Sequence, residues 1–193
     1  MVLARLRKIL SVRITDPLVS LLAMTPLTPN NITWLGLLMA VIAALLVAMD
    51  NLLAAGFIVI FGGFLDMLDG ALARRTGKVS RFGGVLDSTI DRLSEGVLLL
   101  GIIYFYTKEG FTSGILLTGS VMLSSLLVSY IRSRAEAAGV ECFVGLFTRP
   151  ERVIVLTLGL FTNQLLIALT VIAVFSSFTV AQRLFYVWRY IKD

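Results

Sequence analysis

Apolar residues occur in six long stretches along this chain, and short polar intervals separate them. A helix that crosses a membrane needs about 20 mostly apolar residues. The stretches that meet or approach this length lie at 31–50, 52–75, 82–107, 112–134, 145–161 and 164–190. The pattern therefore predicts an all-α polytopic integral membrane protein, a single domain over residues 1–193 with six transmembrane helices bundled over 31–190.

The N-terminal segment, residues 1–24, has a different pattern. Basic and aliphatic residues alternate in it, namely Arg5, Arg7, Lys8 and Arg13 among Leu3, Leu6, Ile9 and Leu10. This alternation is typical of an amphipathic helix that lies on an anionic membrane surface. A signal peptide is the alternative, but Arg13 and Asp16 interrupt the apolar region that it requires.

The composition excludes several classes of protein. Hydrophobic residues make up 58% of the chain and charged residues 15%, whereas soluble domains have roughly 45–50% and about 25%. An ordinary water-soluble enzyme and a disordered chain are therefore excluded. Histidine is absent and Cys142 is the only cysteine, so catalysis by histidine and an intrachain disulfide are also excluded.

The distribution of basic residues predicts the orientation in the membrane. Six crossings place 15 of the 17 lysines and arginines on the side of the two termini: Arg5, Arg7, Lys8, Arg13, Arg74, Arg75, Lys78, Arg81, Arg132, Arg134, Arg149, Arg152, Arg183, Arg189 and Lys192. The opposite side has only Lys108, and Arg92 lies within the third stretch. Basic loops stay in the cytoplasm, so we expect both termini there. The net charge of +5 is then a membrane-surface feature, and nothing indicates nucleic acid as a partner.

Four aspartates lie near the junction of the second and third apolar stretches. Asp66 and Asp69 are three positions apart, and Asp87 and Asp91 are four apart, so each pair shares one face of its helix. Ionisable side chains at membrane depth are costly and usually functional. Small residues that permit close approach of a helix or a ligand accompany them, namely Gly70, Ala73 and Gly83.

An antiparallel hairpin of these two stretches predicts which aspartates meet. The loop covers about residues 75–81. At 1.5 Å per residue, Asp69 and Asp87 both lie roughly 9 Å below it. Asp66 and Asp91 both lie roughly 14–15 Å below it. We therefore expect all four carboxylates to converge at a shallow depth below the cytoplasmic face.

Four adjacent carboxylates need compensating positive charge, because like charges at short range oppose ionisation. Two divalent cations would neutralise them, and a ligand set of oxygens alone suits Mg²⁺ or Mn²⁺. Two such ions about 4 Å apart can support an in-line displacement at phosphorus. The alternative is a set of ion pairs between the aspartates and nearby arginines, namely Arg74, Arg75, Arg81 and Arg92.

These residues resemble the signature of the CDP-alcohol phosphotransferase family. The pattern Asp66-x2-Asp69-Gly70-x2-Ala73-Arg74-x8-Gly83-x3-Asp87-x3-Asp91 matches it at all eight defined positions. The six-span architecture resembles the family over essentially the whole chain. The resemblance implies a metal-dependent enzyme of phospholipid biosynthesis that transfers a phosphatidyl-type group from a CDP-linked lipid to an alcohol and releases CMP. It also implies a homodimer.

The resemblance further implies roles for individual residues. Metal binding is expected at Asp66, Asp69, Asp87 and Asp91, and Asp91 is expected to act as the general base on the acceptor hydroxyl. The CDP donor is expected to contact Pro29, Asp69, Gly70, Ala73, Arg74, Thr76, Ser80 and Gly83. For Thr76 and Ser80 the alternative is a merely solvated side chain, and for Pro29 it is a simple helix start.

A second basic cluster indicates a phosphorylated acceptor, because arginine matches phosphate geometry. It lies around the loop after the fourth stretch and consists of Arg132, Arg134, Arg149 and Arg152. For Arg132 and Arg149 the alternative is a basic cytoplasmic loop without a ligand. The segments at 129–136 and 149–152 resemble the branch of the family that makes phosphatidylinositol phosphate or archaetidylinositol phosphate. That resemblance implies inositol 3-phosphate as the soluble acceptor and either CDP-diacylglycerol or CDP-archaeol as donor. It suggests Arg134, Arg152 and Arg183 as ligands of the acceptor phosphate.

Two alternatives to this function stay open on the sequence. Glycerol 3-phosphate is the main rival acceptor, because it also requires basic ligands. A cation transporter is the rival from another class, because intramembrane aspartates also form ion pathways. Transporter sites lie near the membrane midplane, whereas these aspartates are expected near one face.

Overall fold

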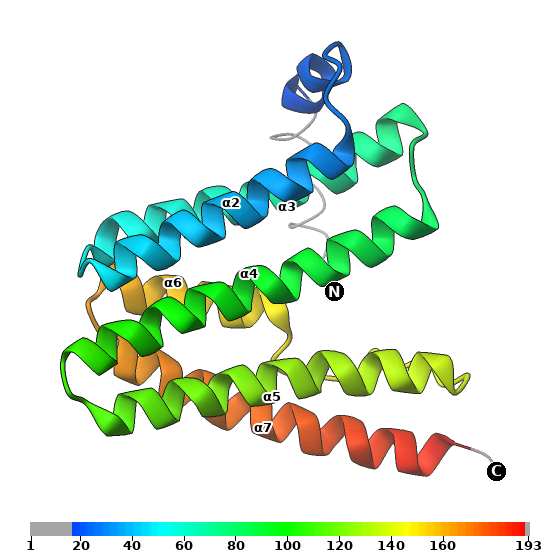
Figure 1. Ribbon diagram of the computed structural model, residues 1–193. Coiled ribbons are helices and arrows are strands. Elements are labelled where there is room, and N and C mark those ends of the chain that lie inside the picture. The colour runs from blue at the N-terminus through cyan, green and yellow to red at the C-terminus, as the bar shows by residue number, and fades with distance from the viewer. Residues whose placement is uncertain (1–16, 192–193) are drawn as a thin grey trace.

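The computed structural model describes residues 17–191, and its regular structure is entirely α-helical. After a short helical segment at 17–23, the helices are α2 (Pro29–Ala48), α3 (Leu52–Thr76), α4 (Arg81–Lys108), α5 (Thr112–Ala137), α6 (Arg149–Phe161) and α7 (Leu165–Tyr190). All six lie where the apolar stretches predict helices (Figure 1). Most of the predicted amphipathic segment at 1–24 lies outside the described residues.

Polar residues at the helix ends explain why these boundaries fall where they do. The Thr28 side chain accepts a hydrogen bond from the Asn31 backbone N–H and begins α2, with Pro29 in its first turn. Ser80 caps α4 in the same way by accepting from Gly83. Gly77 ends α3 in the left-handed conformation, with φ of 66°, which glycine adopts without strain.

Helix α6 is shorter than the predicted span at 145–161. It begins at Arg149, where Thr148 is the N-cap and the Glu151 carboxylate accepts hydrogen bonds from both the backbone N–H and the hydroxyl of Thr148. This capping box and Pro150 fix the start of the helix, and Thr148 itself has an extended backbone. With 13 residues, α6 measures about 20 Å.

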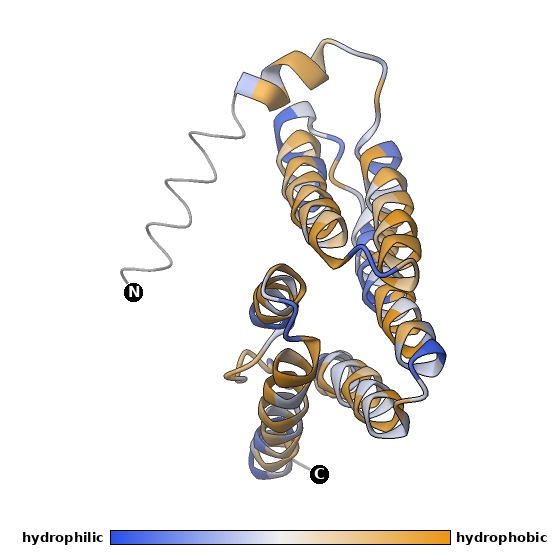
Figure 2. Cartoon of the chain, turned by 90° about the vertical axis from the view of Figure 1, so that its left-hand side faces the viewer, coloured by the Kyte–Doolittle hydropathy of each residue, from blue (hydrophilic) through white to orange (hydrophobic). Residues whose placement is uncertain are grey.

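Four of the described helices are long and apolar enough to cross a membrane, namely α2, α3, α5 and α7. Helix α4 has 28 residues but contains Asp87, Asp91, Arg92 and Glu95, which make it more polar. Many large apolar side chains are exposed on the bundle, and Figure 2 shows apolar residues along every helix. Such a surface is that of an integral membrane protein.

The helices that carry the aspartates both pack against α2, which lies along α3 and α4. Helices α3 and α4 have no comparable contact with each other in the described chain. The simple hairpin expected from the sequence is therefore wrong in its packing, because each of the two helices packs on α2 rather than on the other. On the other side, α4 packs on α5, α5 on α7, and α6 on both α3 and α7.

Candidate active site

Three of the four aspartates converge between α3 and α4. One carboxylate oxygen from each of Asp66, Asp87 and Asp91 lies within 4.8 Å of the others. Asp66 comes from α3, and Asp87 and Asp91 come from successive turns of α4. The structure therefore agrees with the expected approach of Asp66 to Asp91 across the two helices.

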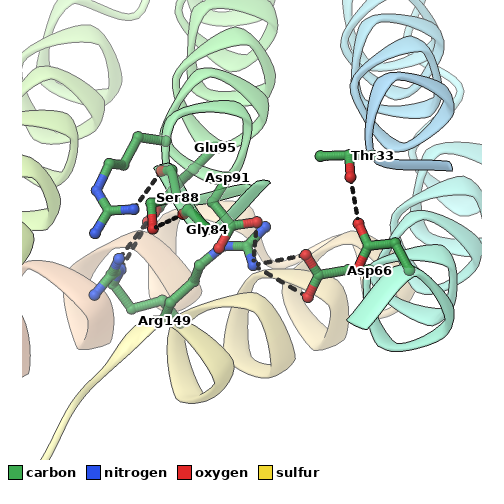
Figure 3. A network of polar contacts seen from close by, with 10 residues as sticks. Thr33, Asp66, Gly84, Ser88, Asp91, Glu95 and Arg149 are labelled. Atoms are coloured by element: carbon green, nitrogen blue, oxygen red, sulfur yellow. Dashed lines mark hydrogen bonds and ion pairs between the residues drawn. The ribbon is translucent and has the colours of Figure 1, made fainter. Parts of the chain in front are cut away.

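Asp69 lies one turn from Asp66 and has a different partner. Its Oδ2 accepts a hydrogen bond of 2.6 Å from the Thr33 hydroxyl of α2 (Figure 3). Asp69 is only 5% exposed. Asp69 thus obtains a hydrogen-bond donor from α2, which packs against both α3 and α4 and is not part of the expected hairpin.

Arg149, at the start of α6, bridges two of the clustered aspartates. Its Nη1 lies 2.8 Å from Asp91 Oδ1 and 3.4 Å from Asp66 Oδ2 (Figure 3). Its Nε is buried and has no hydrogen-bond partner in the described chain. The sequence placed Arg149 in the second basic cluster but not in the site. On the sequence, a role for Arg149 in binding the acceptor and a place in a basic cytoplasmic loop were equally open.

Arg152 lies one turn further along α6 and forms a forked ion pair with Glu95. The distance from Arg152 Nε to Glu95 Oε1 is 2.7 Å, and that from Nη2 to Oε2 is 2.8 Å. Arg152 is 2% exposed, and its Nη1 is buried without a partner in the described chain. Glu95 follows Asp91 by four residues, so the two share one face of α4.

A cavity of about 720 Å³ joins these groups. Its polar wall is formed by Asp66, Asp69, Asp91, Glu95, Arg149 and Arg152. Its apolar wall includes Ile58, Val59, Leu98, Leu99, Val121 and Ile172. Glycine lines it as well, at Gly36, Gly62 and Gly63. The cavity thus places charged side chains and a hydrocarbon-like surface within one space.

The residues predicted to bind the CDP donor lie at the ends of α2, α3 and α4. Gly70 lies beneath the Arg74 guanidinium, since a Cβ there would be 3.3 Å from Arg74 Nη1. Gly83 faces the start of α2, since a Cβ there would be 3.7 Å from Asn30 Oδ1. A side chain would displace the Arg74 guanidinium slightly at Gly70 and would press on the Ser80 hydroxyl, 3.0 Å from such a Cβ, at Gly83.

The other predicted donor ligands have structural roles in these helices. Thr76 donates a hydrogen bond to the Leu72 carbonyl in its own helix, and Ser80 is the N-cap of α4. Pro29 occupies the first position of α2. Ala73 lies in the last turns of α3.

The three arginines predicted to bind the acceptor phosphate have separate environments. Arg152 lines the cavity, whereas Arg134 is exposed near the end of α5. Arg183 is 3% exposed and donates to two backbone carbonyls, from Nε to Val144 at 2.8 Å and from Nη1 to Val128. The structure therefore brings Arg152 to the aspartates but not Arg134.

The clustered carboxylates suit a divalent cation. Three oxygen donors from Asp66, Asp87 and Asp91 lie close enough to contact one ion, and no softer ligand is among them. Mg²⁺ and Mn²⁺ prefer such oxygen ligands. The residues that are present thus fit the metal that the sequence predicts.

Comparison with known proteins identifies similar chains. The family model described as CDP-alcohol phosphatidyltransferase matches residues 26–188. The archaetidylinositol phosphate synthase of Methanothermobacter thermautotrophicus is 41% identical over 187 residues, which cover 93% of this chain and 91% of that protein.

Two crystal structures of Mycobacterium tuberculosis phosphatidylinositol phosphate synthase are also similar. The one with CDP-DAG bound has a TM-score of 0.85 and 36% identity, and the match covers 91% of this chain and 94% of that chain. The complex with manganese and citrate has a TM-score of 0.83 and 36% identity, and the match covers 90% of this chain and 88% of that chain.

Proposed function

The chain belongs to the CDP-alcohol phosphatidyltransferase family, as the aspartate signature predicts, and we propose that it transfers the phosphatidyl-type group of a CDP-linked lipid to inositol 3-phosphate with release of CMP. One observation carries this proposal: three carboxylates within 4.8 Å of one another lie beside two arginines of α6. The relatives named as synthases of archaetidylinositol phosphate and phosphatidylinositol phosphate support the choice of acceptor.

In this reaction Asp91 is the proposed general base. The acceptor hydroxyl oxygen forms a bond to the phosphorus that carries the lipid, the bond from that phosphorus to the CMP oxygen breaks, and the hydroxyl proton passes to Asp91. A carboxylate that is paired with a guanidinium is a weaker base. We therefore expect Arg149 to turn from Asp91 towards a substrate phosphate when the substrates bind.

The proposed metal ligands are Asp66, Asp69, Asp87 and Asp91, which would hold two Mg²⁺ or Mn²⁺ ions. When bound, such ions neutralise negative charge on the phosphates of the donor. The hydrogen bond from Thr33 would orient the Asp69 carboxylate, as partners of metal-binding carboxylates commonly do. The relative solved with manganese supports a divalent cation.

The proposed donor site has a nucleotide part and a lipid part. Pro29, Asp69, Gly70, Ala73, Arg74, Thr76, Ser80 and Gly83 would contact the cytidine nucleotide. The lipid would follow the apolar wall of the cavity, where glycines leave space. Either CDP-diacylglycerol or CDP-archaeol fits this division.

The acceptor phosphate would be held by Arg134, Arg152 and Arg183, with Arg149 as an addition from the structure. The support is strongest for Arg149 and Arg152, because each lines the cavity and has a buried N–H group without a partner in the described chain. Two of the three side-chain nitrogens of Arg183 already donate to carbonyl oxygens. A phosphate at Arg183 would therefore use its Nη2.

We also propose how the protein lies in the membrane. Helices α4 and α6 would complete six spans with the four apolar helices, in one domain over 1–193, with residues 1–24 as an interfacial helix. The distribution of basic residues supports a cytoplasmic position for both termini and the active site. A homodimer is proposed from the family resemblance alone.

The purified protein in detergent tests this function. CMP release from CDP-archaeol and from CDP-diacylglycerol is measured with inositol 3-phosphate, glycerol 3-phosphate or free inositol. We expect release with inositol 3-phosphate and little with free inositol. Faster CMP release with glycerol 3-phosphate would show that glycerol 3-phosphate is the acceptor instead of inositol 3-phosphate. No CMP release with any acceptor would refute the proposed phosphotransferase activity.

A further inference from the structure

Glu95 is a partly buried acid that the proposed reaction does not use. It lies one turn from Asp91 on α4, and its side chain is 13% exposed. Both of its carboxylate oxygens accept hydrogen bonds from Arg152, at 2.7 Å and 2.8 Å. Forked contacts of this type fix a guanidinium in one plane and orientation.

This pairing leaves one edge of the Arg152 guanidinium available. Nε and Nη2 are committed to Glu95, while Nη1 is buried and has no hydrogen-bond partner within the described residues. A buried N–H group without a partner is costly, so such groups are commonly satisfied by a ligand or water. Arg152 and Glu95 both line the cavity that contains Asp66 and Asp91.

The neighbouring turn offers a second donor of the same kind. Arg149 precedes Arg152 by three residues on α6, so the two side chains share one helix face. The Nε of Arg149 is also buried without a partner among the described residues. Two arginine N–H groups at the start of α6 are thus available to an anion beside the aspartates.

We propose that Glu95 is a positioning residue, which holds the Arg152 guanidinium so that Nη1 is presented to the phosphate of the soluble acceptor. This inference rests on the proposed function, and it applies to any phosphorylated alcohol. Glu95 itself touches neither substrate. Its negative charge is offset by the two hydrogen bonds from Arg152, so it orients the arginine without repelling the acceptor.

Substitution of Glu95 separates this role from simple electrostatics. Removal of a negative charge near an anionic acceptor should lower the acceptor KM if charge alone matters. Loss of the fixed orientation of the Arg152 guanidinium should raise the acceptor KM. We expect Glu95→Gln to raise the acceptor KM about tenfold or more. The KM for the CDP donor should change by less than about threefold, since a change of that size corresponds to less than one hydrogen bond.

Glu95→Asp guards against misfolding, because it retains the charge that balances buried Arg152. The side chain is one methylene shorter, so it should draw the guanidinium towards α4. We expect an acceptor KM between those of the wild type and Glu95→Gln, with an unchanged thermal midpoint. Glu136→Gln is the matched control, since Glu136 pairs with Arg132 at 2.8 Å on the exposed surface of α5. It should leave both KM values unchanged.

The kinetic outcomes are distinct. A lower or unchanged acceptor KM in Glu95→Gln overturns the inference. So does an equal rise in both KM values, which would indicate a merely structural role. If Glu95→Gln does not fold, an unchanged acceptor KM in a folded Glu95→Asp overturns the inference as well. Wild-type protein that releases no CMP with any phosphorylated acceptor refutes the proposed function instead.

Discussion

Thr33 of α2 donates a hydrogen bond of 2.6 Å to Asp69 of α3, although the two residues are 36 positions apart. Thr33 is itself 7% exposed, so this bond lies inside the bundle. It connects α2, which packs on both α3 and α4, to the signature aspartate that lies outside the closest carboxylate cluster. Helix α2 therefore takes part in the organisation of the active site.

The first prediction concerns this bond. Thr33→Val retains the shape of the side chain and removes the donor. Loss of a group that orients a metal ligand typically weakens metal binding about 10- to 100-fold. We expect the Mn²⁺ concentration for half-maximal CMP release to rise by that factor. Thr170→Val on α7 is the control, because that exposed hydroxyl bonds to the Leu166 carbonyl in its own helix. An unchanged Mn²⁺ titration of Thr33→Val would contradict the prediction.

The second prediction separates chemistry from binding. Asp91→Asn should lower turnover by about 10²–10⁴-fold, as expected when a general base is removed. The CDP donor should still bind, because Arg74 and the remaining aspartates are intact. Equilibrium binding of CDP and single-turnover CMP release measure the two effects. Turnover near that of the wild type would show that another group is the base.

The third prediction is a requirement for a divalent metal. Excess EDTA should abolish CMP release, and Mg²⁺ or Mn²⁺ should restore it, because clustered carboxylates offer oxygen ligands only. Asp66→Asn should shift the metal titration to higher concentration. Binding of Mn²⁺, followed by electron paramagnetic resonance, gives a readout that does not depend on activity. Full turnover in excess chelator would rule out the metal site.

The fourth prediction concerns the packing that positions α4. A Cβ at Gly101 would lie 2.6 Å from the Ala44 carbonyl oxygen and 2.8 Å from its Cα, so α2 and α4 would have to separate. Gly101→Ala should destabilise the protein by about 1–3 kcal/mol, as is typical of overpacking. Gly119→Ala is the control, since nothing lies within 4 Å of that position. Thermal midpoints in detergent measure the stability of the two variants. Equal midpoints for Gly101→Ala and Gly119→Ala would refute the close contact between Gly101 and Ala44.

The sequence predicted those features that depend on local patterns. Helix α3 was expected at 52–75 and is observed at Leu52–Thr76, because apolar runs and capping residues are local signals. The approach of Asp66 to Asp91 followed from counting residues on either side of one loop. The start of α6 was missed, because the capping box at Thr148 interrupts a run that is otherwise apolar.

Contacts between distant segments could not be predicted in this way. Arg149 and Asp66 are 83 positions apart, and they meet because α6 packs on α3. The bond between Thr33 and Asp69 likewise depends on where α2 lies. No spacing rule within one helix specifies either contact. The sequence therefore identified the aspartates but not the residues that bind to their carboxylates.

The last prediction concerns Arg183, which the family resemblance suggests as an acceptor ligand. Its Nε and Nη1 donate to the carbonyls of Val144 and Val128, so it joins α7 to α5 and to the segment before α6. Arg183→Lys retains the charge, but one ammonium group cannot reproduce this forked geometry. We expect a lower thermal midpoint, because buried carbonyls lose their donors, and a higher acceptor KM, because the segment at 140–148 leads to Arg149 and Arg152. Arg189→Lys, at an exposed position on α7, is the control and should change neither quantity. An unchanged midpoint would contradict the structural role of the two carbonyl contacts, and an unchanged acceptor KM would contradict the proposal that Arg183 binds the acceptor phosphate.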